Sequence, residues 1–413
     1  MKRNIGLYSL YRIFSYDMFF YNVISFFYFT TVKGLDVSQI LFIEALYPIY
    51  VLILQIPCTT IAKKLGAKNS IIIGNLLWII GFIVYIIAPN LISIIFADIL
   101  IAIGDILKLI SEPAILIQSL KEENKEDSFA KLEGEGVGRY YYIETITAVL
   151  AGFLFVINPY IPFILGALMC TISMLIASQF SNVKATIDIE YGSFKEYIYG
   201  LKNGIKDVIN KKRLQALILY SSVFTGIIAI SSCYYKNFFN NIGMDTEQFG
   251  LIFALLTIIQ GIACQRQYIV ERKTKNKTLT WTALIFTGSL ISIGILGISG
   301  LQTSVIVVLL IILLIIQKII EGTYQISIKK YMVSFTTSGT ITNVLTSSDL
   351  FNNIGTSLIL FFGAFILDNM DMSYGYIVFG SIGFVLMALI LVFMKTRVGL
   401  KPEDYKEYLK EDK

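Results

Sequence analysis

The chain has 413 residues, of which 55% are hydrophobic and 15% charged, and its formal net charge is +5. A mean hydropathy of +0.70 excludes an ordinary soluble globular protein. Histidine is absent, which removes imidazole metal ligands, the commonest general base and any histidine proton relay. The four cysteines lie far apart in apolar stretches, so the sequence indicates neither a disulfide framework nor a metal site.

Apolar runs of roughly 20 residues, long enough to cross a bilayer, recur along the whole chain. These runs do not alternate as the strands of a membrane barrel would, so the sequence predicts an all-α integral membrane protein. Twelve spans are expected, at residues 8–31, 38–62, 70–88, 91–115, 136–157, 160–180, 214–236, 248–270, 278–299, 304–328, 341–366 and 374–395.

Basic residues gather in every second connection between these spans, as expected of cytoplasmic loops. The only basic residues in the intervening outer loops are Lys33 and Lys236. The sequence therefore predicts a multi-pass protein of the cell (plasma) membrane with both termini in the cytoplasm. The positive net charge then faces the anionic lipid bilayer, and no nucleic-acid partner is needed to explain it.

The longest break between apolar runs, residues 181–213, falls between the sixth and seventh spans. It predicts an N-terminal six-helix bundle (1–180), a central cytoplasmic loop with an amphipathic helix (181–213), and a C-terminal six-helix bundle (214–413). The two halves echo each other, because Asp105 and Lys318 are separated by the same number of residues as Lys108 and Glu321. Two pseudo-symmetric halves are typical of secondary transporters.

A short basic loop follows the second span of each half. In "TTIAKKLGAK", Lys64, Gly66 and Lys68 match positions of the pattern G-x-x-x-D-R/K-x-G-R/K-R/K, and "QYIVERKTK" keeps its acidic and basic pair as Glu271 and Arg272. Together with the six-plus-six topology, these loops make the sequence resemble the major facilitator superfamily (MFS). The resemblance covers nearly the whole chain. Segments such as "LQIPCTTIAKKLG" and "GDILKLISEPAILIQSL" are similar to its bacterial drug-efflux branch.

The resemblance implies that spans 1, 4, 7 and 10 line a central cavity and that spans 3, 6, 9 and 12 lie outermost. A charge at mid-bilayer costs at least ~2.5–3.5 kcal/mol, so the outermost spans are expected to lack charges, and they do. The candidate cavity charges in the other spans are Arg12, Asp17, Glu44, Asp98, Asp105, Lys108, Glu112, Arg139, Glu144, Lys318, Glu321 and Asp349.

The fourth span is the most heavily charged. Asp98, Asp105 and Glu112 recur every seventh residue and share one stripe of the helix. Lys108 is then within side-chain reach of both Asp105 and Glu112. Because a buried ion pair is weak evidence for stability, the set as a whole favours a function, although any one residue could simply lock helices together.

No nucleotide motif is present: "GEGVGR" at residues 134–139 follows no strand, so an ion gradient is the expected energy source. A carboxyl group in a low-dielectric site can exchange protons near neutral pH, and Asp17 is the first candidate carrier, followed by Glu144 and Asp349. The sequence predicts a monomeric, non-enzymatic transporter without cofactor or metal that exports amphipathic, drug-like small molecules in exchange for protons.

Two alternatives stay open. A proton-coupled importer of a sugar, peptide or other nutrient would use the same scaffold, and "TITAVLAGFLFVINP" in the fifth span meets the antiporter signature of the family poorly. A channel or a membrane receptor is the more remote alternative. A channel has no need of charges whose signs are exchanged between the two halves, as they are where Asp105 corresponds to Lys318 and Lys108 to Glu321.

The swapped charges predict contacts between the halves, Asp105 with Lys318 and Lys108 with Glu321, which form in one state and are exchanged for pairs within a helix in the other. Asp105→Lys should then impair transport severely, because it strands or repels buried charges. Adding Lys318→Asp should restore part of the transport rate, measured in reconstituted vesicles. A double variant no better than the worse single variant would contradict the pairing.

Overall fold

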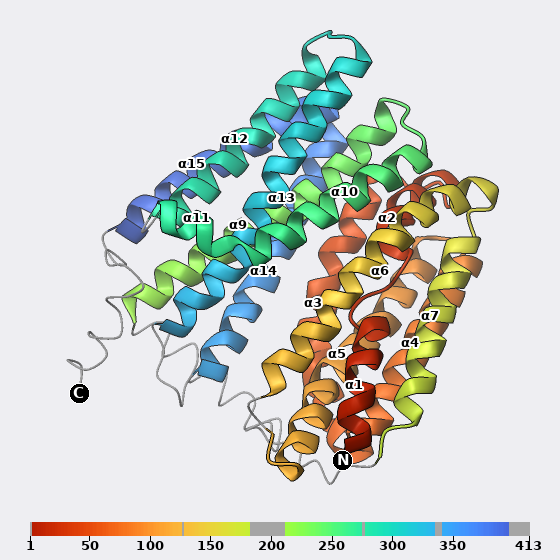
Figure 1. Ribbon diagram of the computed structural model, residues 1–413. Helices are drawn as coiled ribbons and strands as arrows, with labels where there is room; N and C mark the ends of the chain where they lie inside the picture. The colour runs from red at the N-terminus through yellow and green to blue at the C-terminus, as the bar shows by residue number, and fades with distance from the viewer. Residues whose placement is uncertain (1, 126–127, 182–210, 275–276, 335–340, 396–413) are drawn as a thin grey trace. The chain divides into compact units, whose positions relative to one another are not determined.

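The computed structural model describes residues 2–125, 128–181, 211–274, 277–334 and 341–395, and these residues form helices without any strand (Figure 1). The amphipathic helix predicted in the central loop lies outside the described residues. The all-helical membrane fold is confirmed. Ten helices in the described part of the chain are long and apolar enough to cross a membrane.

The first half of the chain contains α1 (Lys2–Ser15), α2 (Tyr21–Phe27), the π-helical turn η1 (Tyr28–Val32), α3 (Val37–Leu65), α4 (Ala67–Ile87), α5 (Leu91–Glu122), α6 (Phe129–Ile157) and α7 (Ile161–Ser178). The second half contains α9 (Lys212–Asn241), α10 (Thr246–Gln265), α11 (Gln267–Thr274), α12 (Thr278–Ile298), α13 (Thr303–Ser334), α14 (Ile341–Asn369) and α15 (Met372–Lys395).

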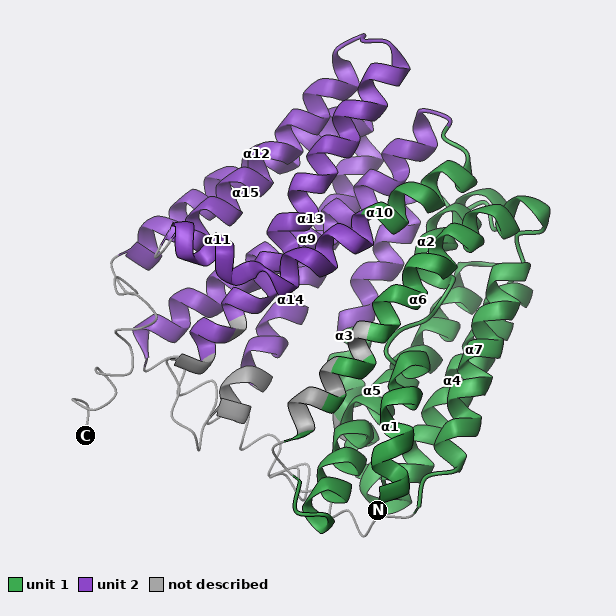
Figure 2. Cartoon of the chain, in the orientation of Figure 1, with its two compact units in different colours: residues 1–36, 49–197, 244–255 green, residues 37–48, 198–243, 256–413 purple. Residues whose placement is uncertain are grey.

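The helices group into two compact units (Figure 2). Unit 1 comprises residues 1–36, 49–197 and 244–255, and unit 2 comprises residues 37–48, 198–243 and 256–413. The long helices α3 and α10 therefore contribute residues to both units. The predicted boundary loop, 181–213, coincides largely with residues outside the described ranges, so the predicted domain limits stay a prediction.

Unit 1 is built around α1 and the pair α4–α5. Helix α1 packs against α5, α6 and α7, while α4 lies along α5 and α7. Glycines let α4 and α5 approach closely: a Cβ added to Gly104 would lie 2.7 Å from the carbonyl oxygen of Gly74 and 2.8 Å from Cδ1 of Trp78. Such small-residue crossings are how membrane helices gain packing where lipid supplies no hydrophobic driving force.

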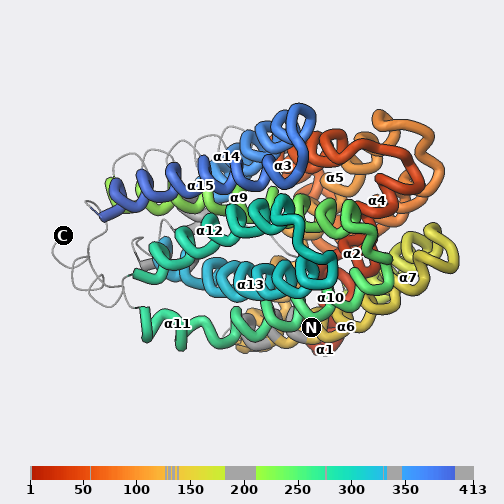
Figure 3. Tube along the Cα trace, turned by 90° about the horizontal axis from the view of Figure 1, so that it is seen from above, coloured from red at the N-terminus to blue at the C-terminus, as the bar shows by residue number. Residues whose placement is uncertain are grey.

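Unit 2 pairs α9 with α14 and α12 with α15, which Figure 3 shows running alongside one another. Three of its helices also share a buried amide: Gln317 on α13 accepts a hydrogen bond from Ser231 on α9 (3.0 Å) and donates one to Ser289 on α12 (2.8 Å). Polar groups inside a membrane bundle need such partners, so this network ties the three helices together.

The first predicted span, residues 8–31, is not one helix. Helix α1 ends at Ser15, α2 begins at Tyr21, and the five residues between them are not helical. Hydropathy alone could not reveal this, because the break is itself apolar and aromatic. Beyond the break, Lys33 fastens the far end of η1 to α4 by donating to the carbonyl oxygens of Ile86 and Ala88, each at 2.8 Å.

The α4–α5 crossing yields a stability prediction. Gly104→Ala should destabilise the protein by about 1–3 kcal/mol, because the new methyl group overpacks against backbone that cannot move aside. The measurement is the thermal unfolding temperature of the detergent-solubilised protein. Gly288→Ala on α12, where an added Cβ meets no atom within 4 Å, is the matched control. Equal unfolding temperatures for the two variants would refute the prediction.

Candidate functional site

The break in the first span places Asp17 between two helical segments. Its Oδ1 accepts the backbone N–H of Met18 (2.7 Å), and its Oδ2 accepts the side-chain amide of Asn22 (3.0 Å). Short polar side chains that bond nearby backbone compete with helical hydrogen bonding, so Asp17 favours an interruption at this point. Phe20 closes the break in the left-handed region, at φ 67°, an unusual conformation for a bulky residue.

Lys108 reaches the break from α5. Its Nζ donates to the carbonyl oxygen of Ser15, the last residue of α1, at 2.8 Å. The same ammonium lies 3.0 Å from the ring centroid of Trp78 on α4, and Lys108 is only 3% exposed. The sequence placed Lys108 between Asp105 and Glu112 on its own helix. Its described hydrogen bond goes instead to the end of α1.

Glu112 binds two residues of α1. The Tyr11 hydroxyl donates to its Oε1 at 2.6 Å, and the Arg12 guanidinium donates to its Oε2. The side chains of Arg12 and Glu112 are 15% and 4% exposed, so this ion pair is largely shielded. Arg12 and Glu112, which were predicted separately as cavity charges, thus form one ion pair that holds α1 against α5.

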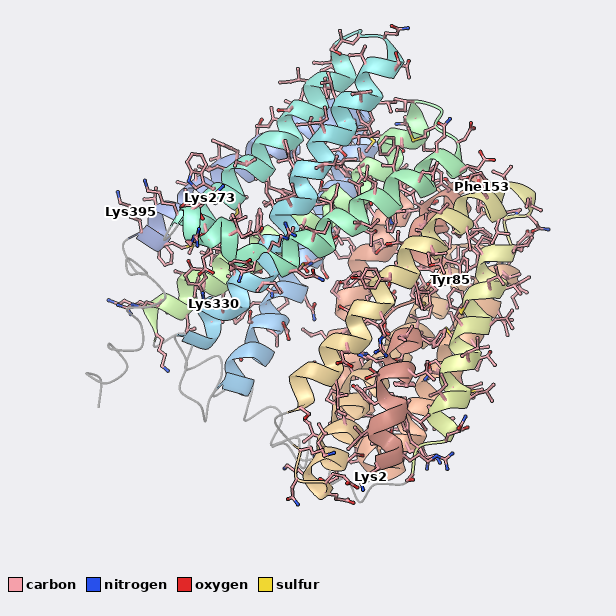
Figure 4. The ribbon with its side chains drawn as sticks, viewed as in Figure 1. Lys2, Tyr85, Phe153, Lys273, Lys330 and Lys395 are labelled. Carbon is pink, nitrogen blue, oxygen red and sulfur yellow. The ribbon has the colours of Figure 1, made fainter. Side chains whose placement is uncertain are left out.

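Asp98 occupies the other end of the charged stripe on α5. The hydroxyl of Tyr85 on α4, marked in Figure 4, donates a hydrogen bond to its Oδ1. The ring of Tyr85 stacks on Tyr21 of α2, with centroids 5.5 Å apart and an interplanar angle of 12°. Asp98 therefore supports the second segment of the broken helix through Tyr85.

Glu144 on α6 belongs to the same region of unit 1. It is 3% exposed, and the Thr147 hydroxyl lies 3.4 Å from its Oε2. One turn earlier, the Tyr140 ring packs against two residues of the break, with centroids 4.8 Å from Tyr16 and 5.0 Å from Phe19. The carboxyl groups of Glu144 and Asp17 are close enough to interact electrostatically.

The predicted charges of unit 2 lie differently. Lys318 pairs with Glu321 one turn along α13 at 2.7 Å, and Gln260 of α10 donates to the other oxygen of Glu321 at 3.0 Å. Glu44 on α3 and Asp349 on α14 are exposed within the chain. Unit 2 thus satisfies Lys318 and Glu321 mainly within one helix, unlike the contacts between helices of unit 1.

Arg139 and the basic loops lie away from the break. Arg139 is exposed and lies 3.9 Å from Glu135 on the same helix. Gly66 begins α4 at φ 77°, where L side chains rarely fit, so the match to the loop pattern has a conformational reason. In the second loop, Glu271 accepts from Lys330 of α13, the lysine labelled in Figure 4, at 2.9 and 3.1 Å. This pair holds α11 against α13.

Sequence reasoning missed the partners of the charges. Asn22, Trp78, Tyr85 and Tyr140 were not selected, although each now contacts a charged side chain or the break. The usable signal was weak. Asn22 is a polar residue in an apolar run close to Asp17, while Trp78 and the tyrosines look like ordinary membrane aromatics.

Buried, hydrogen-bonded charges and an interrupted helix inside a bundle of apolar helices are typical of multi-pass membrane transporters. The family model for the Major Facilitator Superfamily matches residues 9–348. The chain belongs to this superfamily of membrane transporters.

A curated relative is the uncharacterized MFS-type transporter YxaM of Bacillus subtilis (strain 168), which is 26% identical over 226 residues. The match covers 54% of this chain and 55% of YxaM, so the chain spans about half the length of this relative.

Among solved structures, the chain is similar to the nucleoside transporter NupG, with a TM-score of 0.74, 15% identity, and coverage of 95% of this chain and 98% of that chain. A POT family transporter in complex with 5-aminolevulinic acid matches with a TM-score of 0.71 and 16% identity, over 95% of this chain and 96% of that chain. The D-xylose-proton symporter matches with a TM-score of 0.69 and 10% identity, over 95% of this chain and 96% of that chain. At these identities, the likeness shows the fold alone.

The Arg12–Glu112 pair yields a stability prediction. Arg12→Met should cost about 3–5 kcal/mol, because it strands a buried carboxylate. Adding Glu112→Gln should recover much of this loss, since the neutral amide oxygen still accepts from Tyr11. Thermal unfolding of the purified variants measures both effects.

The exposed pair on α6 supplies the control. Arg139→Met should cost about 0–1 kcal/mol, as expected for a solvated pair. A double variant less stable than Arg12→Met alone would show that Glu112 is not held chiefly by Arg12.

Proposed function

We propose that this protein is a secondary transporter that works by alternating access and exports amphipathic, drug-like small molecules in exchange for protons. Membership of the superfamily supports transport, and the absence of a nucleotide motif supports gradient coupling. The observation that carries the proposal is Asp17 in the interrupted first helix, beside the buried Glu144. Irregular backbone at membrane depth is typical of ion and substrate sites in transporters.

Asp17 is proposed as the proton carrier because its hydrogen bonds change with its charge. As a carboxylate, it accepts from the Met18 N–H and from the Asn22 amide. A protonated Asp17 gains a donor and loses acceptor capacity, so one of these contacts must weaken. Proton binding would thus alter the segment that joins α1 to α2, which is what coupling requires. Glu144 and then Asp349 are the further candidates.

Aromatic residues at the break support an amphipathic substrate that carries a positive charge. Tyr16, which is 36% exposed, packs with Tyr140 and also lies 6.0 Å from Tyr141 between ring centroids. Aromatic faces attract organic cations, and the nearby carboxyl groups would reinforce that attraction. The substrate partner is therefore proposed as a small organic molecule, with a proton as the coupling ion.

Import of a nutrient is the second candidate. It is favoured by the similar solved structures, which include a nucleoside transporter and a D-xylose-proton symporter, and by the weak antiporter signature in α6. Drug susceptibility of cells with and without the gene, measured across many compounds, separates the two candidates. Export predicts that loss of the gene increases susceptibility to some compounds. Import predicts no such increase and a growth defect on a particular nutrient.

The remaining parts of the proposal follow from the charge pattern. We place the protein in the cell membrane with cytoplasmic termini, because the basic loops fall in every second connection between the predicted spans, and we propose that it is a monomer. The loop residues Lys64, Gly66, Lys68, Glu271 and Arg272 are proposed to control the conformational change. Exchange of partners among Asp105, Lys108, Lys318 and Glu321 is proposed to accompany it, and the Lys318–Glu321 pair is one of the expected arrangements within a helix.

The role of Asp17 yields the central prediction. Asp17→Asn should abolish transport driven by a pH gradient in proteoliposomes, because the amide cannot take up and release a proton. Counterflow of substrate, which needs no net proton movement, should persist in the same variant. Both rates are measured with a labelled substrate found in the susceptibility screen.

Glu247→Gln on α10 is the control, because it removes an acidic side chain that lies outside the proposed site. This variant should keep gradient-driven transport. Gradient-driven transport at the wild-type rate by Asp17→Asn would remove Asp17 from the mechanism.

A further inference from the structure

The interruption of the first span is not required by the architecture of a six-helix half. Helix α9, which opens the second half, runs for 30 residues from Lys212 to Asn241 without a break. Its counterpart in the first half stops at Ser15 and resumes at Tyr21. The two halves share one plan, so the break needs a cause local to unit 1.

We infer that Lys108 is a positioning residue that caps α1 at Ser15 and keeps the first membrane helix interrupted. Asp17 then stays in the non-helical segment between α1 and α2, where it can bind and release a proton. This inference rests on the proposed function of Asp17, but the state of the helix can be measured without transport.

The cap replaces a specific helical hydrogen bond. In a continuous α-helix, the carbonyl oxygen of Ser15 would accept the N–H of Phe19, four residues further on. Here it accepts the ammonium of Lys108 at 2.8 Å. Ser15 is 2% exposed, and a buried carbonyl group needs a donor from the protein where the helix stops. A cation at the carboxyl end of a helix is also favoured by the helix dipole.

The position of the ammonium is fixed by the backbones of α4 and α5. A Cβ added to Gly74 would lie 2.8 Å from Cγ of Lys108 and 2.8 Å from the carbonyl oxygen of Gly104. The stem of Lys108 therefore passes through the glycine crossing, and the Trp78 ring covers its ammonium. With 3% exposure, Lys108 is held as a rigid donor aimed at the end of α1.

A plain counter-ion role explains the geometry less well. The acidic groups within electrostatic range of Lys108 are Glu112, Asp105 and Asp17. Arg12, which has the same positive charge, repels Lys108. Glu112 already binds Arg12 and Tyr11. Lys318, a partly buried lysine of α13, is bonded to Glu321 one turn away and illustrates what a counter-ion pair looks like in this fold. Lys108 differs because its hydrogen bond goes to backbone.

The interrupted form also contains conformations that a continuous helix would remove. Phe20 has a left-handed φ of 67°, and the Met18 N–H is bonded to Asp17 rather than to a helical carbonyl. Strained backbone persists only where its surroundings hold it. Without the ammonium, the donor that an α-helix would supply to Ser15 is the Phe19 N–H, and that bond would extend α1 through Asp17.

Amide hydrogen exchange of residues 16–20, followed by mass spectrometry on the full chain in nanodiscs, tests the cap directly. In the wild-type protein these amides should exchange faster than the corresponding turns of α9. Lys108→Met should slow their exchange by about tenfold or more, because the helix closes over them. A side chain that merely stabilised the fold would have the opposite effect when removed.

Two further variants sharpen the test. Lys108→Arg, which keeps a cationic donor, should retain fast exchange in residues 16–20. Lys318→Met, which removes a lysine that is paired within α13 of unit 2, should leave the exchange of this segment unchanged. Exchange in Lys108→Met that is unchanged or faster would overturn the inference, as would wild-type amides at 16–20 that are as protected as those of α9.

The wild-type measurement tests the inference even if Lys108→Met fails to fold. Slow exchange at residues 16–20 of the wild-type protein would show that the first helix is not interrupted there, which would leave Lys108 nothing to cap. Failure of the proposed function gives a different pattern. Asp17→Asn would then keep gradient-driven transport, while the exchange results in the Lys108 variants would still follow the inference.

Discussion

The constraint on which the rest of this structure depends is the absence of water in the bilayer core. Each backbone carbonyl and each charge placed there needs a partner supplied by the protein. Most of the described chain meets this demand by being helical. Where the helix stops at Ser15, the demand is met by Lys108, and where charges enter α5, it is met by Arg12, Tyr11 and Tyr85.

This constraint distributes the charges unequally between the two units. In unit 1, the hydrogen bonds of Lys108 and Glu112 go to residues of α1, and Lys108 also lies on the ring of Trp78, so these charges link α1, α4 and α5. In unit 2, Lys318 and Glu321 largely satisfy each other on α13, and a neutral amide, Gln317, links the helices instead. Two halves with the same plan have thus come to use their buried polar groups in different ways.

The sequence predicted the membrane class and fold because hydropathy and the positive-inside pattern report burial in lipid directly. It also identified α5 as exceptional, because four charges on one apolar helix are visible without a structure. The partners were not predictable. Spacing along α5 shows that Lys108 can reach Asp105 and Glu112, but the approach of α1 decides that it bonds to Ser15. The break was hidden because Met18, Phe19 and Phe20 are as apolar as a helix would be.

The two lysine contacts on the first span have a mechanical consequence. Lys108 attaches the segment before the break to α5, and Lys33 attaches the segment after it to the end of α4. Each segment therefore has its own anchor, so a change of backbone conformation in the five residues between them need not break either lysine contact. The continuous helix α9 offers no such separation in unit 2.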